Sequence, residues 1–214
     1  MDIKHIVWDW NGTLLNDKNL AVTAINVLLK KYDLKEINLE EYLEVFSFPV
    51  IDYYARLGFD FDKTPFSVVG TEFIEEYTAR MYDVQMHDGA KEVLQYIDNS
   101  TITQSLLSAA KQQMLDSLLD FHNIDKYFDR VVGLDNHYAN SKLDAGKQWL
   151  KELGIPKTQI LFVGDTMHDV EVANNLGANC ALIANGHATY AKLEASGERV
   201  FKNIIEFKNW FSTL

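Results

Sequence analysis

From residue 89 onward, short apolar segments alternate with segments whose apolar residues recur at helical spacing. This alternation constrains the fold more than any other feature, because strands separated by helices of about ten residues form parallel sheets covered on both faces. Residues 3–9 are also mostly apolar, as expected for a strand buried on both faces. The sequence therefore predicts an α/β fold built on a doubly wound parallel sheet.

The positions of the core elements follow from where apolar residues repeat with the period of a strand or of a helix. We expect strands at residues 3–9, 102–107, 130–134, 160–164 and 180–184. We expect helices at residues 20–32, 91–97, 111–121, 144–153, 170–176 and 204–211.

Residues 33–84 differ from this alternating region. They are rich in aromatic and acidic residues, contain two of the three prolines and show helical spacing. We therefore expect a helical insertion after the first strand, with residues 17–85 as one domain and residues 1–16 and 86–214 as the sheet domain. His87, Asp88 and Gly89 mark the return to the sheet domain. The aromatic residues are interpreted as the core of the insertion rather than as a base-stacking platform.

The composition is that of a globular protein, with 47% hydrophobic and 24% charged residues among 214. The formal net charge of -11 argues against nucleic acid or an anionic membrane as the main partner. An anionic substrate would need a local positive feature, such as a metal ion. The single Cys180 fits a reducing compartment, and no apolar run reaches the ~20 residues of a membrane-spanning helix. We expect a cytoplasmic protein.

The first strand ends in Asp9, and a turn containing Gly12 and Thr13 follows. Open parallel sheets present reactive groups at the carboxyl ends of their strands. Asp9 is therefore a candidate nucleophile. A turn aspartate that accepts backbone hydrogen bonds explains the same residue, since so short a motif occurs by chance.

Two further carboxylates follow the strand at 160–164. Asp165 comes directly after Gly164, and Asp169 stands at the start of the next helix. Either residue alone can cap that helix. Together with Asp9, they form a cluster of hard oxygen ligands of the kind that Mg²⁺ prefers.

Two other positions have both a functional and an ordinary interpretation. Ser108 lies between a strand and a helix, where a hydroxyl either caps the helix or binds an anion with the free amides. Lys142 precedes a helix and is either a solvated surface charge or the charge that balances a carboxylate-rich pocket. With Mg²⁺ and Lys142 present, the charges of Asp9, Asp165 and Asp169 are cancelled, and a phosphate can enter.

In this order, the segment from Asp9 to Thr13, Ser108, Lys142 and the segment GDTMHD resemble the haloacid dehalogenase-like (HAD) superfamily. The resemblance covers essentially the whole chain and is strongest to the phosphoglycolate phosphatase-like group, whose helical cap follows the first strand. It implies an Mg²⁺-dependent phosphatase that acts on a small phosphorylated metabolite through an aspartyl-phosphate. Residues 17–85 are then the cap, which would close over the pocket and exclude water.

The resemblance also implies roles for individual residues. Asp9 is the nucleophile, and it binds Mg²⁺ together with Asp165 and the backbone carbonyl of Asn11. Asp169 completes the metal site by holding a metal-bound water or by orienting Lys142. Lys142 stabilises the nucleophile and the developing charge. The groups implied to bind the phosphoryl oxygens are Thr13, Ser108 and neighbouring amides such as that of Ala109.

Three residues depart from the usual pattern of these phosphatases. Ala109 stands where an asparagine is common and Leu143 where a proline is common, and both changes are local. Asn11 stands where an aspartate usually transfers protons. An amide cannot do so, and general acid-base catalysis contributes ~10² to 10⁴ in rate. We expect slow turnover of alkyl phosphates, less impairment with acyl or aryl phosphates, and faster turnover in Asn11→Asp.

His168 and His187 are the nearest candidates to replace the missing aspartate, although a loop histidine bonded to backbone is the favoured interpretation of each. In the insertion, Arg56 either binds a substrate carboxylate or is a solvated helix residue.

Two alternatives remain open. One is a catalytically weak Mg²⁺-binding module with a regulatory role. The other is a phosphonatase-like carbon–phosphorus hydrolase with Lys30, Lys31 or Lys35 as its Schiff-base lysine. Dehalogenation is disfavoured, because it needs no metal and leaves Asp165 and Asp169 without a purpose.

Overall fold

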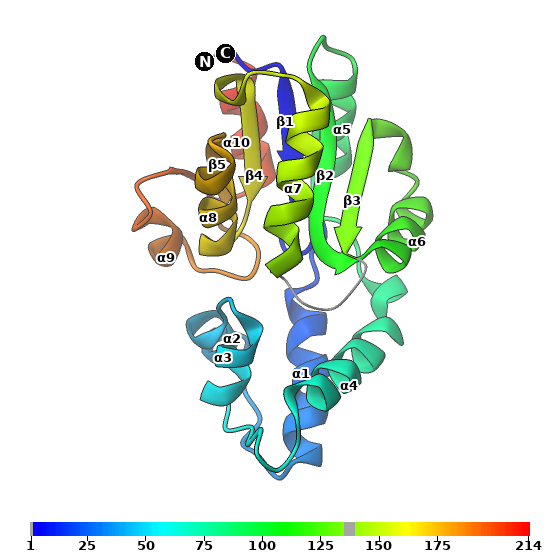
Figure 1. The fold of residues 1–214 in the computed structure, drawn as a ribbon, viewed down its shortest axis with the longest axis vertical. Coiled ribbons are helices and arrows are strands. Elements are labelled where there is room, and N and C mark those ends of the chain that lie inside the picture. Colours follow the sequence, from blue (N-terminus) through cyan, green and yellow to red (C-terminus); the bar gives the residue numbers. More distant parts are fainter. Residues whose placement is uncertain (1, 135–139) are drawn as a thin grey trace.

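The structure, a computed structural model, describes residues 2–134 and 140–214, with the side chains of residues 140–142 and 145 outside that description. Within these residues, six parallel strands form one sheet in the order β3-β2-β1-β4-β5-β6. Helices cover both of its faces (Figure 1), which confirms the expected doubly wound α/β fold. The strands are β1 (His5–Trp8), β2 (Thr103–Lys111), β3 (Arg130–Leu134), β4 (Ile160–Gly164), β5 (Asn179–Ile183) and β6 (Arg199–Phe201).

Each face of the sheet carries its own apolar cluster. On one face, α5 (Ala90–Asp98), α6 (Gln112–His122) and α10 (Ile204–Phe211) enclose a core that includes Trp8 and Phe207. On the other face, α7 (Asn140–Leu153), α8 (Met167–Leu176) and α9 (Tyr190–Glu194) contribute to a core that includes Phe162 and Leu176. Burial on both faces explains why the central strands are almost continuously apolar.

Most of the expected elements are present, and the differences lie at their ends. Strands β3 and β4 and helix α10 have the expected bounds, whereas α7 and α8 begin earlier. Strand β6 and helix α9 were not expected, because a three-residue edge strand and a five-residue helix are too short to show a period. Strand β2 continues to Lys111, four residues beyond its expected end.

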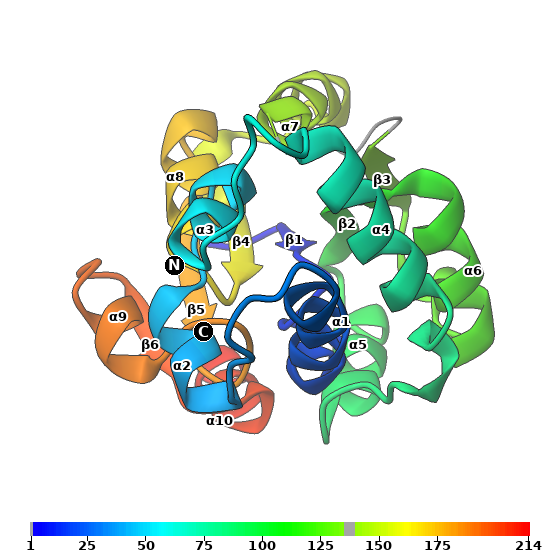
Figure 2. The same ribbon diagram turned by 90° about the horizontal axis from the view of Figure 1, so that it is seen from below.

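Residues 18–83 form the helices α1 (Lys18–Lys31), α2 (Leu39–Val45), α3 (Val50–Arg56) and α4 (Phe66–Thr78), followed by a short 3₁₀ turn at Met81–Asp83. Proline directly precedes α3 and α4, and a capping box between Asn38 and Glu41 begins α2. These helices lie beyond the carboxyl ends of the strands, and seen from that side they are arranged around the ends of β1 and β4 (Figure 2). We call α1 to α4 the cap helices.

The cap helices share an aromatic core. Tyr42, Tyr53, Tyr54 and Phe59 are buried in one cluster with the apolar face of α1. This agrees with the interpretation of the aromatic residues as a core, although several of them also line a cavity described below. No helix in the described residues is long and apolar enough to cross a membrane.

A buried histidine fixes the start of β1. His5 is fully buried, its Nδ1 lies 2.6 Å from Thr103 Oγ1 and its Nε2 lies 2.8 Å from Ser105 Oγ, both on β2. Burial lowers the pKa of His5 to about 4 from an ordinary 6.5. The folded protein therefore keeps this ring neutral at pH values at which the unfolded chain would protonate it.

We predict that this histidine makes the fold acid-sensitive. Because the unfolded chain takes up a proton below pH 6.5 and the folded chain does so only near pH 4, stability is lost as the pH falls through that interval. Urea unfolding at several pH values should show a steeper loss for the wild type than for His5→Gln, and no such difference in slope above pH 7. Parallel pH dependences of the two proteins would contradict the prediction.

Candidate active site

Three buried carboxylates meet at the carboxyl ends of two adjacent strands. Asp9 follows β1, Asp165 follows β4 and Asp169 lies in the first turn of α8. One oxygen of each lies within 4.8 Å of the others. Burial, together with repulsion from Asp169 and Asp9, raises the pKa of Asp165 to about 8 despite the opposing effect of His187. The cluster thus has the donor set and the concentration of negative charge that suit a divalent cation.

Asp169 also caps the helix on which it lies. Its Oδ2 accepts hydrogen bonds from the backbone amides of Asp165 at 3.2 Å and Thr166 at 3.0 Å, and from Thr166 Oγ1 at 2.8 Å. The expected alternatives for this residue, a helix cap and a member of a carboxylate cluster, are therefore combined. These hydrogen bonds at the start of α8 fix the loop that carries Asp165.

Two glycines allow the loops to approach Asp165. A Cβ atom at Gly12 or at Gly186 would overlap with Asp165 Oδ2, and Gly12 also has a φ of +77°. The backbone amide of His187 donates to the same oxygen at 2.6 Å. Thr13 Oγ1 is fully buried and lies 3.0 Å from Asp165 Oδ1 and 3.3 Å from Asp9 Oδ2. The loop with Gly12 and Thr13 and the loop with Gly186 and His187 therefore both contact the carboxylate cluster.

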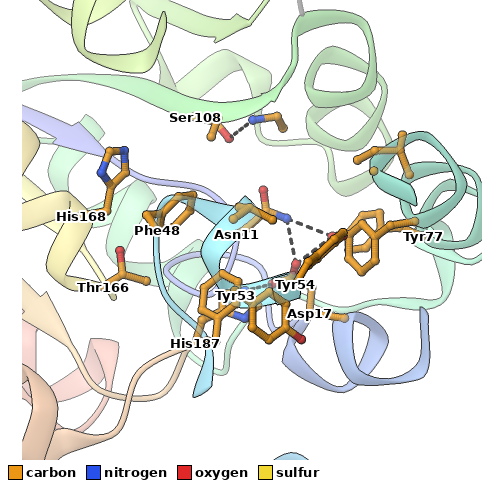
Figure 3. Close-up of a pocket in the computed structure, with 18 of the residues that line it drawn as sticks. Asn11, Asp17, Phe48, Tyr53, Tyr54, Tyr77, Ser108, Thr166, His168 and His187 are labelled. Carbon is orange, nitrogen blue, oxygen red and sulfur yellow. Dashed lines mark hydrogen bonds and ion pairs between the residues drawn. The ribbon is translucent and has the colours of Figure 1, made fainter. Parts of the chain in front are cut away.

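Asn11 does not stand free in the cavity but is bonded through its side-chain amide (Figure 3). Its Nδ2 donates to Asp17 Oδ2 at 2.8 Å and to the hydroxyl of Tyr77 at 2.9 Å, and that hydroxyl donates to Asp17 Oδ2 at 2.8 Å. Tyr77 belongs to cap helix α4, and Asp17 directly precedes α1. The residue that departs from the usual pattern thus connects the Asp9 loop to the cap helices.

His187 completes this network from the other side. Its Nε2 lies 3.1 Å from Asp17 Oδ1, which also accepts from the amide of Gly12 at 2.8 Å. Burial alone would lower the pKa of His187, but Asp17, with Asp165 and Asp9, outweighs this effect and raises it to about 9. His187 is then protonated at neutral pH, and its Nδ1 donates to the hydroxyl of Tyr42, 2.8 Å away on cap helix α2. Asp17 and His187 form a buried ion pair with a cap tyrosine on each side.

The carboxylate cluster opens into a cavity of about 280 Å³ between the strand ends and the cap helices. Asp9, Asn11, Ser108, Ala109, Asp165 and Asp169 line it on the sheet side. Figure 3 shows Phe48 and His168 side by side in its wall, with ring centroids 4.5 Å apart. The aromatic residues of the cap wall are Tyr42, Phe46, Phe48, Tyr53, Tyr54, Phe66, Phe73 and Tyr77.

The structure corrects the interpretation of Ser108 as a helix cap. Helix α6 begins at Gln112, four residues later, because Ala109 and Ala110 continue β2 through a register shift next to β3. Ser108 is buried, and its Oγ accepts from the amide of Ala110 at 3.0 Å. Its position on the cavity wall leaves the anion-binding interpretation as the one to test.

The remaining candidates lie as follows. Arg56 donates to the carbonyl of Val45 at 2.9 Å and to Ser47 Oγ, and it does not line the cavity. A substrate contact by Arg56 therefore has no geometric support. Lys142 belongs to the first turn of α7, and its side chain lies outside the described part of the structure.

None of the three lysines considered for a Schiff base lines the cavity. Lys31 pairs with Glu72 at 2.7 Å and Lys35 with Glu41 at 2.6 Å, and Lys30 is exposed at the end of α1. The cap helices thus supply no lysine for phosphonatase chemistry at this cavity.

Sequence reasoning did not single out Asp17 or Tyr77. Asp17 is 2% exposed although it is an aspartate in a short polar segment. Two of its partners, Tyr77 and His187, lie 60 and 170 residues away in the chain, whereas Asn11 and Gly12 are close in sequence. No local pattern predicts such pairings. The one usable signal was that Asp17 follows the Asp9 loop at the start of the insertion.

Comparison with known proteins agrees with this architecture. Residues 6–183 match the family described as haloacid dehalogenase-like hydrolase. The chain belongs to this family. It is therefore a hydrolase, and the HAD resemblance expected from its motifs is confirmed.

Relatives of known name share about a quarter of their residues with this hydrolase. A phosphoglycolate phosphatase of Pseudomonas fluorescens is 26% identical over 85% of this chain and 70% of its own length. A pyrophosphatase, PpaX, of Oceanobacillus iheyensis is 24% identical over 86% of this chain and 85% of its own length. A haloacid dehalogenase-like family hydrolase of Streptococcus pneumoniae has the same fold, with a TM-score of 0.85 at 19% identity over 98% of this chain and 99% of that chain.

The close approach of Gly186 to Asp165 yields a prediction. Gly186→Ala should lower the free energy of unfolding by about 1–3 kcal/mol, because its methyl group would overlap with a buried carboxylate and with the carbonyl of Gly12. Thermal unfolding measures the effect. Gly70→Ala is the matched control, since a Cβ there meets only the ring of Phe66 at 3.9 Å. Equal melting temperatures of Gly186→Ala and the wild type would contradict the prediction.

Proposed function

We propose that this hydrolase is an Mg²⁺-dependent phosphatase that acts on a small phosphorylated metabolite through an aspartyl-phosphate at Asp9. The observation that carries the proposal is the cluster of Asp9, Asp165 and Asp169, buried beneath a cavity at the ends of β1 and β4. The names of the relatives, phosphoglycolate phosphatase and pyrophosphatase, agree with phosphoryl chemistry.

The donor set fits Mg²⁺. Asp9, Asp165 and Asp169 would each offer one carboxylate oxygen, and the backbone carbonyl of Asn11 would offer another. Bound there, Mg²⁺ would neutralise charge on the phosphoryl oxygens and let an anionic substrate enter an otherwise negative pocket. The raised pKa of Asp165 reflects how strongly the cluster favours a compensating positive charge.

The proposed reaction has two steps. In the first, a carboxylate oxygen of Asp9 attacks phosphorus, and the bond between phosphorus and the leaving-group oxygen breaks with its electron pair going to that oxygen. In the second, water attacks the same phosphorus, the aspartyl-phosphate bond breaks, and inorganic phosphate and the Asp9 carboxylate are released. Thr13, Ser108 and the amide of Ala109 are proposed to bind the phosphoryl oxygens, and Lys142 to stabilise the charge that develops.

Position 11 limits this chemistry. The side-chain amide of Asn11 has no proton to transfer to a leaving alkoxide, and its Nδ2 donates hydrogen bonds to Asp17 and Tyr77. His187 is not a free replacement, because it is ion-paired with Asp17 and bonded to Tyr42. The proposal is therefore an enzyme that is slow with alkyl phosphates and faster where the leaving group needs no proton.

The first test is a panel of phosphate esters with and without Mg²⁺. We expect Mg²⁺-dependent release of phosphate by the wild type, and a loss of at least about 10³-fold in kcat for Asp9→Asn, because the nucleophile is removed. Asp62→Asn, an exposed aspartate of the cap segment, is the matched control and should keep wild-type activity. Inertness of the wild type towards every ester, with Mg²⁺ binding intact, would refute the phosphatase and favour the regulatory module.

The second test concerns Asn11. In Asn11→Asp alone, the new carboxylate would face Asp17 Oδ2 at the 2.8 Å now spanned by a hydrogen bond, so repulsion should suppress much of the gain expected from the sequence. The exchange Asn11→Asp with Asp17→Asn restores a donor and an acceptor at this contact. We expect kcat on an alkyl phosphate to rise by about 10²- to 10⁴-fold in the double variant.

The matched control for the exchange is Asp17→Asn alone, which keeps the Asn11 amide and should show no gain. The three variants and the wild type are to be compared at the same pH and Mg²⁺ concentration. A double variant no faster than the wild type on any ester would show that proton transfer at position 11 does not limit the rate.

A further inference from the structure

We propose that the leaving group of the substrate is an uncharged aromatic group, so that this enzyme hydrolyses aryl or arylalkyl phosphates. The inference rests on the phosphatase function proposed above and names its substrate class. The relatives are named for substrates that carry a second anionic group, a carboxylate in phosphoglycolate and a phosphate in pyrophosphate. The cap helices of this chain offer no charged side chain to such a group in the cavity.

The cap helices contribute no charged side chain to the cavity, and Asp17, which directly precedes α1 and also lines it, is paired with His187. Residues 18–85 are all described, and those that line the cavity include neither a lysine nor an arginine nor a carboxylate. Eight of them are aromatic, and the others are Ala21, Val50, Ile74, Ser67, Thr71 and Gly70. A leaving group that extends from Asp9 towards the cap would meet ring faces and aliphatic side chains.

Basic residues near this wall are engaged elsewhere. Arg56 bonds to Val45 and Ser47 outside the cavity, and Lys18 donates to the carbonyl of Asn185 at 2.7 Å. His187 is paired with Asp17. A carboxylate or a second phosphate in the leaving group would lose its hydration and meet no cationic side chain among residues 18–85. Hydroxyl groups alone could donate to it there, such as that of Tyr53, which is buried without a hydrogen-bond partner, and this compensates a buried anion poorly.

Lys111 is the lysine that does line the described cavity. It is exposed and stands at the end of β2, three residues beyond Ser108, on the sheet side where the phosphoryl group is proposed to bind. Its position suits the phosphoryl group rather than a leaving group under the cap. The test below includes this lysine.

The size and the ring geometry fit one aromatic group. The cavity of about 280 Å³ holds a small organic molecule. Phe48 stacks on His168 with an angle of 26° between the rings, and Tyr42 stacks on Phe46 with centroids 5.1 Å apart. Aromatic walls of this kind favour an aromatic ligand through offset stacking and edge-to-face contacts.

The amide of Asn11 also favours an aromatic leaving group. In the first step the electron pair of the broken bond stays on the leaving-group oxygen. An alkoxide then needs a proton that Asn11 cannot supply, whereas a phenolate is stable enough to leave and takes its proton from water afterwards. The aromatic cavity thus suits both aryl and arylalkyl phosphates, and the loss of the carboxylate favours the aryl phosphates among them.

The experiment compares substrates of equal chemical reactivity. 2-Phenylethyl phosphate and 2-phosphoglycolate are both alkyl phosphates, so they differ mainly in what the leaving group presents to the cap. With Mg²⁺ we expect kcat/KM to be on the order of 100-fold higher for the phenyl compound, and phenyl phosphate to be faster still. Pyrophosphate should be the poorest substrate.

A variant pair tests whether the cap wall sets this preference. Thr71→Arg places a cation at an exposed position of α4 that lines the cavity, and it should reduce the preference for the phenyl compound by about tenfold or more. Val68→Arg adds the same charge to the same helix at a site that is 43% exposed and does not line the cavity. It should leave the preference unchanged.

The outcomes separate this inference from the proposed function. Faster turnover of phosphoglycolate or pyrophosphate would overturn the aromatic substrate class and leave the phosphatase intact, and a loss of that turnover in Lys111→Met would assign the anionic group to Lys111. If no ester is hydrolysed, the phosphatase fails, and binding of non-hydrolysable phosphonates decides the inference. Calorimetry with Mg²⁺ should then show phenylphosphonate bound more tightly than phosphonoacetate, and the reverse order would overturn it.

Discussion

The surrounding structure has to offset the mutual repulsion of Asp9, Asp165 and Asp169. Three carboxylates buried within 4.8 Å of one another are unfavourable unless a positive charge and many hydrogen-bond donors surround them. The fold supplies donors from Thr13, from the amide of His187 and from the start of α8. Gly12 and Gly186 let the backbone of two loops approach Asp165, and beside Gly186 the amide of His187 donates to it.

A second charge pair joins this cluster to the cap helices. Asp17 is surrounded by donors from the Asp9 loop, from His187 and from Tyr77, while Tyr42 holds the far side of His187. Breaking the contact with either tyrosine would leave a buried polar group without its partner, which is costly. The cap helices are therefore joined to the Asp9 loop and to His187 by directional hydrogen bonds and not by apolar packing alone.

The sequence predicted those parts of the fold and of the site that depend on neighbouring residues, and it did not predict contacts between residues far apart in the chain. The sheet, its order of elements and the positions of Asp9, Asp165 and Asp169 follow from local periodicity and from the rule that parallel strands present residues at their carboxyl ends. The helix-cap alternative for Ser108 was wrong, because two alanines extend β2 where a helix start was expected, and its phosphoryl-binding role stays a prediction. The roles of Asp17 and Tyr77 were not predicted, because their hydrogen bond depends on how the cap helices pack relative to the sheet.

Asn11 shows why the local and the long-range descriptions have to be combined. Taken alone, it is a missing carboxylate, and a defect in proton transfer is the natural interpretation. In the structure the same amide donates to Asp17 and Tyr77, a position in which a carboxylate would be repelled. The loss of the acid and the gain of the cap contact are thus one change. In the proposed phosphatase, these contacts leave position 11 without a group that transfers protons, which disfavours alkoxide leaving groups more than phenolates.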